Sequence, residues 1–343
     1  MRGRLNIWLC IKLCLLSVVI LVLFAAFEGE NAILGNFHWL QHSLNLLSFT
    51  SQIIILNSST STTRHPLSPP YPYPYKFLIN QPQKCQNRKP FLVLLVMGES
   101  HNVKSRDTIR ETWGNESNYG EIDVVKIFLV GLSPAMTGAI QGVLEEESAM
   151  YGDIVQQDFL DTYYNLTLKT LMGMEWVSKF CPNASYAMKV DNDVFLNVNY
   201  LVHQFLHTEF PAHENYFTGL LVYSARPVRN KKSKWYVPEN VYPSDMFPPY
   251  PSGPGYVFSV DMARKVYGVA QEITVLSVED AFVGICLYKL NILPTEPPKD
   301  LFNGQRIEYD RCIFQNVIMV HHYENEELRN VWSDFWGKNI LGC

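Results

Sequence analysis

Residues 186–195 read Tyr-Ala-Met-Lys-Val-Asp-Asn-Asp-Val-Phe, a short strand-like segment that contains two closely spaced aspartates. The part before the aspartates has the length and composition of a buried strand. Because alternate side chains of an extended chain point the same way, Asp191 and Asp193 can face one point in space. Paired carboxylates at a strand end suit Mg²⁺ or Mn²⁺, although solvated aspartates in a turn have the same spacing. The rest of the chain decides between a metal site and a turn.

The sequence around this segment predicts an α/β fold. Apolar runs at residues 91–96 and 124–130 are typical of strands buried on both faces of a parallel sheet. Residues 106–113 between them suit a helix. A later amphipathic helix repeats an apolar side chain at every fourth position: Leu168, Met172, Trp176 and Phe180. We therefore predict a doubly wound, mostly parallel sheet. Beyond Asp193 the chain is richer in proline, glycine and tyrosine, which predicts an irregular half that wraps the sheet and carries the specific pocket.

The amino-terminal segment predicts a membrane anchor. Residues 7–27 are almost wholly apolar and long enough to cross a bilayer, with arginines before them and glutamates after them. This order of charges predicts a cytosolic tail of residues 1–6, a transmembrane signal-anchor of residues 7–27 and a lumenal remainder. A signal peptide cleaved near Ala25 is the alternative and leads to the same compartment. Serine, threonine and proline then predict a lumenal stem of residues 28–84, followed by a folded lumenal domain of residues 85–343.

The remaining composition agrees with the secretory pathway. A net charge of −5, without blocks of lysine or arginine, argues against nucleic-acid binding. Four Asn-x-Ser/Thr sequons are present, at Asn57, Asn115, Asn165 and Asn183. Two of the seven cysteines lie in the apolar segment, which leaves five. Because five is odd, at most two disulfides form among them and one thiol is left over.

A series of motifs runs through residues 85–328 in a fixed order. They are Arg106-x-x-Ile109-Arg110-x-Thr112-Trp113-Gly114, Asp158-Phe159-x-Asp161-x-Tyr163-Tyr164-Asn165-Leu166-Thr167-Leu168-Lys169-Thr170, Asp191-x-Asp193, Ser233-Lys234-Trp235-Tyr236, Gly253-x-Gly255-Tyr256-Val257-Phe258-Ser259, Glu279-Asp280-x-x-Val283-Gly284 and His321. The series resembles the β1,3-galactosyltransferase branch of glycosyltransferase family 31. Chance can produce any one of these motifs, but their common order is specific to the family.

The resemblance implies an inverting, metal-dependent enzyme of GT-A type, anchored in the Golgi membrane with its catalytic domain in the lumen. The implied reaction moves galactose from UDP-galactose to the 3-hydroxyl of a terminal N-acetylglucosamine on glycoprotein or glycolipid glycans. The implied cofactor is Mn²⁺, with Mg²⁺ as the alternative. Two rival functions stay open. One is a β1,3-N-acetylglucosaminyltransferase that uses UDP-N-acetylglucosamine on terminal galactose, and the other is an inactive sugar-binding relative.

The resemblance also assigns roles to residues. The metal ligands would be Asp191, Asp193 and His321, and in an extended segment only one of His321 and His322 can face the ion. Inversion needs one general base, and by family position this is Asp280, at the start of a predicted helix. The expected nucleotide contacts are the two aspartates together with three cations: Arg106, Arg110 and Lys169. A surface ion pair with Asp107 or Glu111 is the alternative for the two arginines, and for Arg106 in particular.

Four further expectations concern the sugar-stacking residues, a lid, the disulfides and the unpaired thiol. Trp235 and Tyr236 would stack on a sugar ring, and residues 229–234 would form a lid over the donor. The disulfides would be Cys85–Cys181 and Cys286–Cys312. A cysteine that relatives have near the glycine motif is replaced here by Pro251, so Cys343 would be the unpaired thiol.

Overall fold

The computed structural model describes residues 69–135 and 138–337, which belong to one compact unit. The predicted anchor, most of the predicted stem, Asn57 and Cys343 lie outside the described residues. Among the helices that are described, none is long and apolar enough to cross a bilayer.

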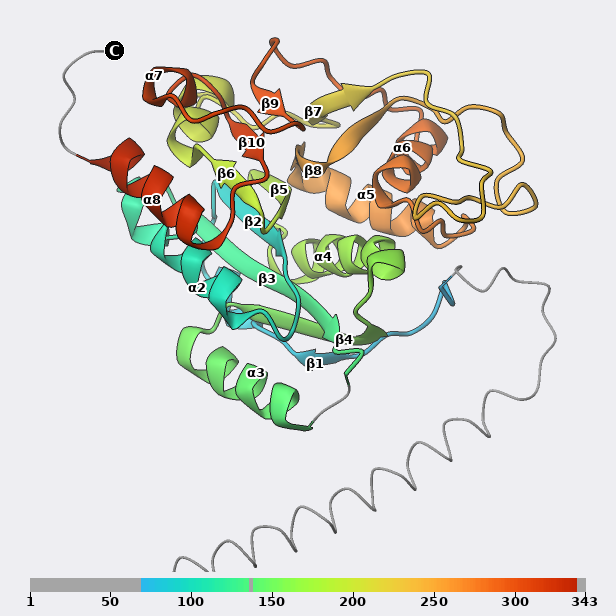
Figure 1. Cartoon of the computed structure of the whole chain (residues 1–343), viewed down its shortest axis with the longest axis horizontal. Helices are drawn as coiled ribbons and strands as arrows, with labels where there is room; N and C mark the ends of the chain where they lie inside the picture. The colour runs from blue at the N-terminus through green and yellow to red at the C-terminus, as the bar shows by residue number, and fades with distance from the viewer. Residues whose placement is uncertain (1–68, 136–137, 338–343) are drawn as a thin grey trace, which may run out of the picture. The chain divides into compact units, whose positions relative to one another are not determined.

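A seven-stranded sheet forms the centre of the fold, in the order β1-β4-β3-β2-β5-β8-β7 (Figure 1). Within the run β4-β3-β2-β5, each strand pairs in parallel with the next. By contrast, β1 runs antiparallel to β4, and β8 runs antiparallel to both β5 and β7. The expected α/β architecture with a mostly parallel sheet is therefore confirmed. The strands are β1 (Phe77–Ile79), β2 (Leu92–Met97), β3 (Val124–Leu132), β4 (Ile154–Leu160), β5 (Tyr186–Asp191), β7 (Phe217–Val222) and β8 (Tyr250–Ser259).

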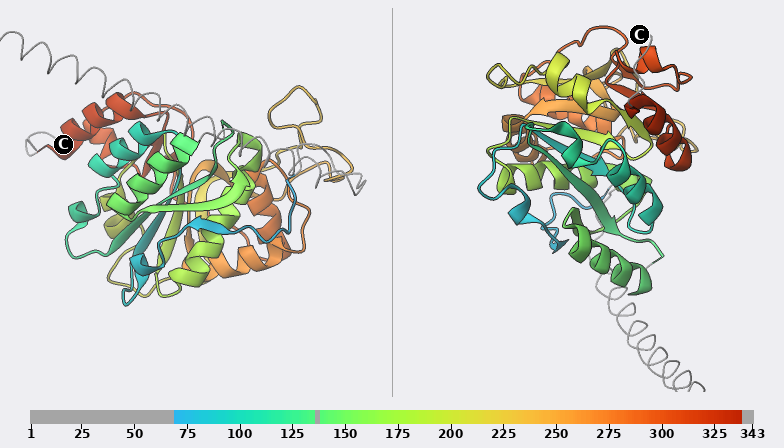
Figure 2. Two further views of the ribbon diagram at one scale, coloured as in Figure 1. Left: turned by 90° about the horizontal axis from the view of Figure 1, so that it is seen from below. Right: turned by 90° about the vertical axis from the view of Figure 1, so that its left-hand side faces the viewer.

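Helices cover both faces of this sheet (Figures 1 and 2). Alternate residues of β2 point into two separate apolar clusters, as expected for a strand that is buried on both faces. One cluster includes α4 (Leu166–Phe180), α5 (Val260–Ala270) and α6 (Glu279–Lys289). The other includes α2 (Val103–Glu111), α3 (Gly138–Tyr151) and α8 (Asn325–Trp336). The predicted periodic helix is α4, and its stripe of apolar residues packs in the core.

A second, three-stranded sheet brings the carboxyl-terminal segment to the Asp-x-Asp turn. It consists of β6 (Val194–Leu196), β10 (Met319–His321) and β9 (Phe302–Asn303), in the order β6-β10-β9. In the antiparallel pairing of β6 with β10, His321 lies opposite Val194, the residue after Asp193. Short helical segments complete the fold: η1 (Pro82–Cys85), η2 (Glu116–Tyr119), η3 (Tyr163–Asn165), the π-helix η4 (Tyr200–Phe205) and α7 (Arg311–Phe314).

The folded unit begins before Cys85, the residue at which the sequence predicted it to start. β1 pairs with the edge of β4, and Tyr71 is buried in the same apolar cluster as α4. The side-chain amide of Gln81 also donates a hydrogen bond of 2.8 Å to Ser148 Oγ of α3. The last part of the predicted stem, from about Tyr71, is therefore part of the fold.

We expect a chain that begins at His65 to be more stable than one that begins at Cys85. The shorter chain loses the burial of Tyr71 and leaves β4 as an unpaired edge strand, so its free energy of unfolding should fall by roughly 2–4 kcal/mol. Urea unfolding and size-exclusion chromatography of both chains measure this. Equal stability and equal solubility would show that residues 65–84 are dispensable.

The structure confirms one expected disulfide and corrects the other. Cys85 and Cys181 are bonded, which ties η1 to the end of α4. Cys286 is a free thiol buried among apolar side chains of α6, so the expected Cys286–Cys312 bond is wrong. Cys312 is itself disulfide-bonded, and its partner is therefore a cysteine other than Cys286.

Candidate active site

The carboxyl end of β5 opens into a cavity of about 650 Å³, a volume typical of small-molecule sites. Four of the predicted site residues line this cavity: Asp191, Asp193, Asp280 and His321. They come from the end of β5, the turn after it, the start of α6 and the end of β10. The fold thus brings the predicted metal ligands and the predicted base together, although they are far apart in the sequence.

Three hydrogen bonds, two to its backbone and one from a side chain, hold the Asp-x-Asp turn in place. The buried indole of Trp113 donates to the Val194 carbonyl at 2.8 Å, and the Tyr323 amide donates to the Asp193 carbonyl at 2.9 Å. The side-chain amide of Asn192 donates to Ser105 Oγ at 3.0 Å. The middle residue of the motif therefore anchors the turn to α2.

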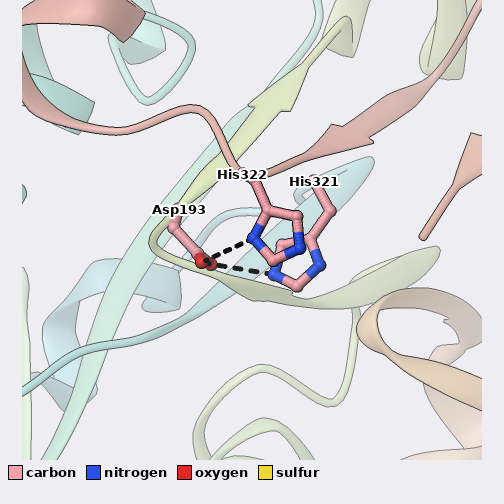
Figure 3. A group of neighbouring side chains, drawn as sticks. All are labelled: Asp193, His321 and His322. Atoms are coloured by element: carbon pink, nitrogen blue, oxygen red, sulfur yellow. Dashed lines mark ion pairs between the residues drawn. The ribbon is translucent and has the colours of Figure 1, made fainter. Parts of the chain in front are cut away.

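Asp193, His321 and His322 form a cluster suited to a metal ion (Figure 3). Asp193 Oδ2 lies 3.2 Å from His321 Nε2 and 3.8 Å from His322 Nδ1. One ligand atom from each residue falls within 4.8 Å of the others. His321 Nδ1 is 3.3 Å from the Gly304 carbonyl, a contact that orients the ring and turns Nε2 toward Asp193. A carboxylate with two imidazoles is a donor set that fits Mn²⁺.

The expectation that only one histidine can face the metal is wrong. It assumed an extended chain, but His322 has a φ of 67°, in the left-handed region. The strand ends there, so the usual alternation of side chains stops. The two rings consequently stack with their centroids 3.8 Å apart, both beside Asp193.

Asp193 and His321 each shift the pKa of the other so that its charged form is favoured. Burial alone would raise the pKa of the Asp193 carboxyl, but the hydrogen bond and charge of His321 outweigh it and lower the pKa. Burial would likewise lower the pKa of His321, and Asp193 outweighs it and raises the pKa. The carboxylate form of Asp193, which a cation requires, is therefore favoured.

Asp191 lines the cavity but is not a member of this cluster. Its Oδ1 lies 2.5 Å from Nζ of Lys189, whose side chain is almost completely buried. Burial would lower the pKa of Lys189, yet the carboxylates of Asp191 and Glu279 outweigh it and raise the pKa. The described geometry therefore gives Asp191 a lysine partner, where the sequence predicted direct metal ligation.

Asp280 lies in the first turn of α6 and faces the cavity. Its Oδ2 accepts a hydrogen bond of 3.1 Å from the Gly253 amide, and its Oδ1 accepts one of 2.8 Å from the Ala281 amide. Burial raises the pKa of the Asp280 carboxyl, and these two backbone donors oppose that shift. The carboxylate is oriented and partly desolvated, as a general base should be.

Glu279, the neighbour of Asp280, is buried behind it. Its Oε1 accepts hydrogen bonds from the hydroxyls of Thr170 at 2.9 Å and Tyr256 at 2.5 Å. Its Oε2 lies 3.9 Å from Lys189 Nζ. Burial raises the pKa of Glu279 to about 7, although Lys189 acts in the opposite direction.

The two predicted nucleotide-binding arginines do not line the cavity. Arg106 is buried, and its Nη2 pairs with Glu147 at 2.6 Å and also donates to the Ser100 carbonyl, while its Nη1 donates to the Glu99 carbonyl. Arg110 pairs with Glu147 at 2.7 Å and Asp153 at 2.8 Å. It also pairs with Asp107 at 2.9 Å, so the alternative ion pair is present for this arginine. Arg106 thus holds the loop after β2 rather than a nucleotide, and its partner is neither Asp107 nor Glu111.

We expect Arg106→Met to destabilise the fold and to leave UDP binding by the folded protein intact. Removing one partner of a buried ion pair typically costs about 3–5 kcal/mol, and Arg110 still shields Glu147, which favours the lower end. Urea unfolding and UDP titration measure the two effects. Arg329→Met is the matched control, because Arg329 forms a more exposed pair with Glu111. Unchanged stability with lost UDP binding would restore the nucleotide role.

Lys169 is also buried away from the cavity. Its Nζ lies 2.6 Å from Asp161 Oδ1 and donates to the Gly98 carbonyl. The other carboxylate oxygen of Asp161 accepts a hydrogen bond of 2.9 Å from the Gly131 amide. Lys169 therefore joins α4 to the ends of β2 and β3, and a direct diphosphate contact is not what the structure shows.

Two aromatic side chains, Tyr163 and Trp235, line the cavity beside Lys234, the last residue of the predicted lid. Trp235 is half exposed, and its indole donates to Tyr163 Oη at 2.9 Å. The ammonium of Lys234 lies over both rings, at 5.0 Å from Tyr163 and 4.9 Å from Trp235. Tyr236 is buried, so of the two predicted stacking residues only Trp235 is presented to a ligand.

The sequence assigned no role to several residues that line the cavity, among them Tyr163, Lys189 and Arg226. It also did not predict His322 as a second histidine ligand or Glu279 as a buried part of the site. A signal existed for Lys189, because a charged residue inside an otherwise apolar strand needs a buried partner. None existed for His322, whose position depends on the backbone turn at the end of β10.

Comparison with known proteins places the chain in a family. The family model described as Galactosyltransferase matches residues 104–298. The chain is 46% identical over 282 residues to the mouse protein beta-1,3-galactosyltransferase 2, covering 82% of this chain and 66% of that protein. It is 40% identical over 272 residues to mouse beta-1,3-galactosyltransferase 1, covering 79% of this chain and 82% of that protein. The chain thus spans just under two thirds of the length of the first relative.

Solved structures resemble the chain only distantly. The bifunctional glycosyltransferase WbbM gives a TM-score of 0.39 at 8% identity, covering 73% of this chain and 50% of that one. A Drosophila β1,4-galactosyltransferase 7, in complex with manganese, UDP-galactose and xylobiose, gives a TM-score of 0.35 at 10% identity, covering 74% of this chain and 75% of that one.

The mostly parallel sheet and the acidic cavity at the end of β5 are those expected of a GT-A type glycosyltransferase. The chain belongs to the galactosyltransferase family, in which its relatives are beta-1,3-galactosyltransferases.

Proposed function

We propose that the protein is an inverting β1,3-galactosyltransferase that transfers galactose from UDP-galactose to the 3-hydroxyl of a terminal N-acetylglucosamine. The observation that supports this most directly is one cavity that holds both the Asp193–His321–His322 cluster and the carboxylate of Asp280. Family membership and the identity to beta-1,3-galactosyltransferases support the sugar and the linkage.

In the proposed reaction, Asp280 takes the proton of the acceptor hydroxyl while that oxygen attacks the anomeric carbon of galactose. The bond from the anomeric carbon to the phosphate oxygen breaks, and its electron pair leaves with UDP. One displacement inverts the anomeric centre, so no covalent nucleophile is needed. The amides of Gly253 and Ala281 hold the carboxylate in place, and Trp235 offers a flat surface to the acceptor ring.

The proposed cofactor is Mn²⁺, with Mg²⁺ as the alternative. When bound, the ion would act as a Lewis acid for the diphosphate. Asp193, His321 and His322 are the residues that would hold it, and Asp191, fixed by Lys189, would add negative charge beside them. The type II anchor remains a prediction from the amino-terminal sequence, and the Golgi location remains one from the resemblance to the family.

A donor and acceptor screen tests the proposal. The chain from His65 onward is incubated with UDP-galactose, a β-linked N-acetylglucosamine acceptor and Mn²⁺, and the product linkage is determined by NMR. We expect a β1,3-linked galactose, no product with EDTA and none from UDP-N-acetylglucosamine on a galactose acceptor. Product from the second pair alone would replace galactosyl transfer by its rival, and UDP binding without any transfer would indicate an inactive relative.

A further inference from the structure

Lys189 is a charged residue in the interior of the central sheet. It lies on β5 between apolar neighbours and is 3% exposed. Because side chains alternate along a strand, Lys189 shares a face with Ala187 and Asp191, the face that packs against α4 and α6. An ammonium group in such a place must be compensated by buried acceptors.

The partners of Lys189 come from both sides of the candidate site. Its Nζ lies 2.5 Å from Asp191 Oδ1, on the side of the Asp-x-Asp turn. It also donates to the Gly253 carbonyl, and it lies 3.9 Å from Glu279 Oε2. Gly253 and Glu279 adjoin Asp280, since the Gly253 amide donates to Asp280 Oδ2 and Glu279 precedes Asp280 in α6. One ammonium therefore connects the two groups of carboxylates.

Fold stability is a weak reason for this arrangement. A buried ion pair contributes little compared with apolar side chains of the same size, and both neighbours of Lys189 in β5, Met188 and Val190, are apolar. By contrast, transfer depends strongly on the relative placement of reacting groups, and a misplacement of about 1 Å can cost about 100-fold in rate. Connecting the turn to the helix gives Lys189 a function that a methionine of similar length cannot replace.

We propose that Lys189 is a positioning residue that sets the placement of Asp280 relative to the Asp-x-Asp turn. It acts through Asp191 on one side and through the Gly253 peptide and Glu279 on the other. The inference rests on the proposed transferase function of the cavity. It assigns Lys189 no contact with the reacting atoms.

The test compares Lys189→Met with Lys126→Met. Lys126 is the matched control, because it is a buried lysine of the same sheet that pairs with Asp153 at 2.7 Å outside the cavity. We expect both variants to lose stability, but only Lys189→Met to lose about 100-fold in kcat, with a smaller change in the KM for the acceptor. Turnover of Lys189→Met close to wild type, or an equal loss in Lys126→Met, would overturn the inference.

Glu279→Gln provides a second test if Lys189→Met fails to fold. It keeps the shape of the side chain but removes the charge that faces Lys189, so it should lower kcat while leaving UDP affinity unchanged. In the double variant the losses should be less than multiplicative, because both changes break one connection. Unchanged turnover of Glu279→Gln, or fully multiplicative losses where the double variant folds, would contradict the connection.

Crystal structures separate this inference from the proposed function. In Lys189→Met, or in Glu279→Gln, the Asp280 carboxylate should move relative to Asp191, whereas in Lys126→Met it should stay in place. If the wild type transfers no sugar, the proposed function fails, but this displacement still tests the positioning role. Unmoved carboxylates would overturn the role even in an active enzyme.

Discussion

Asp193→Ala is expected to lose sugar transfer and, with it, the dependence of UDP binding on Mn²⁺. Asp193 is the one carboxylate of the described Asp193–His321–His322 cluster, and its Oδ2 faces both rings. Metal stabilisation of a departing phosphate contributes several kcal/mol, so kcat should fall by about 10³-fold or more. Calorimetric titration of UDP with and without Mn²⁺, together with turnover, measures the two losses.

The two histidines of the cluster are expected to contribute unequally to Mn²⁺ binding. His321 is largely buried and lies nearer to Asp193, so His321→Ala should approach the effect of Asp193→Ala. His322 is half exposed and its nitrogen lies farther away, so His322→Ala should weaken Mn²⁺ binding less. Asp334→Ala is the control, because Asp334 is an exposed carboxylate on α8 that accepts from Tyr309. Mn²⁺-dependent UDP binding that survives in Asp193→Ala would place the metal elsewhere.

The parts of the site that the sequence could predict are those fixed by local pattern or by ordered motifs. A buried strand that ends in Asp191 is visible in residues 186–191, and the period of α4 is visible in its apolar stripe. His321 and Asp280 were found through motif order alone. Their meeting depends on the pairing of β6 with β10 and on α6 reaching the end of β5, which no local pattern encodes.

The parts that could not be predicted depend on partners distant in the sequence. The spacing of Arg106 and Arg110 places them on one face of a helix. It does not indicate whether that face turns toward the cavity or toward other parts of the protein. Their acidic partners, Glu147 and Asp153, lie some 40 residues further along, on α3 and before β4. Cys286 was assigned a disulfide by analogy, whereas α6 places its thiol in the apolar core.

Asp280→Asn is expected to keep donor binding and to lose most turnover. The asparagine matches the shape of the carboxylate but cannot take the proton of the acceptor hydroxyl, so kcat should fall by about 10²–10⁴-fold. One of the amides of Gly253 and Ala281 loses its acceptor, at a cost in stability of about 1–3 kcal/mol. Thermal unfolding must therefore show that the variant is folded before turnover and UDP–Mn²⁺ affinity are compared with the wild type.

The pH profile identifies the base, because Asp280 and Glu279 both have raised pKa values. A base works only when deprotonated, so the kcat/KM of the wild type should fall as the pH drops through the pKa of that group. With Asp280 as the base, Glu279→Gln keeps this acid limb, and the residual activity of Asp280→Asn lacks it. If instead Glu279→Gln abolishes a limb near pH 7 while Asp280→Asn retains it, Glu279 is the proton acceptor. Wild-type turnover in Asp280→Asn would exclude Asp280 outright, since no other change in that variant restores a carboxylate to the position.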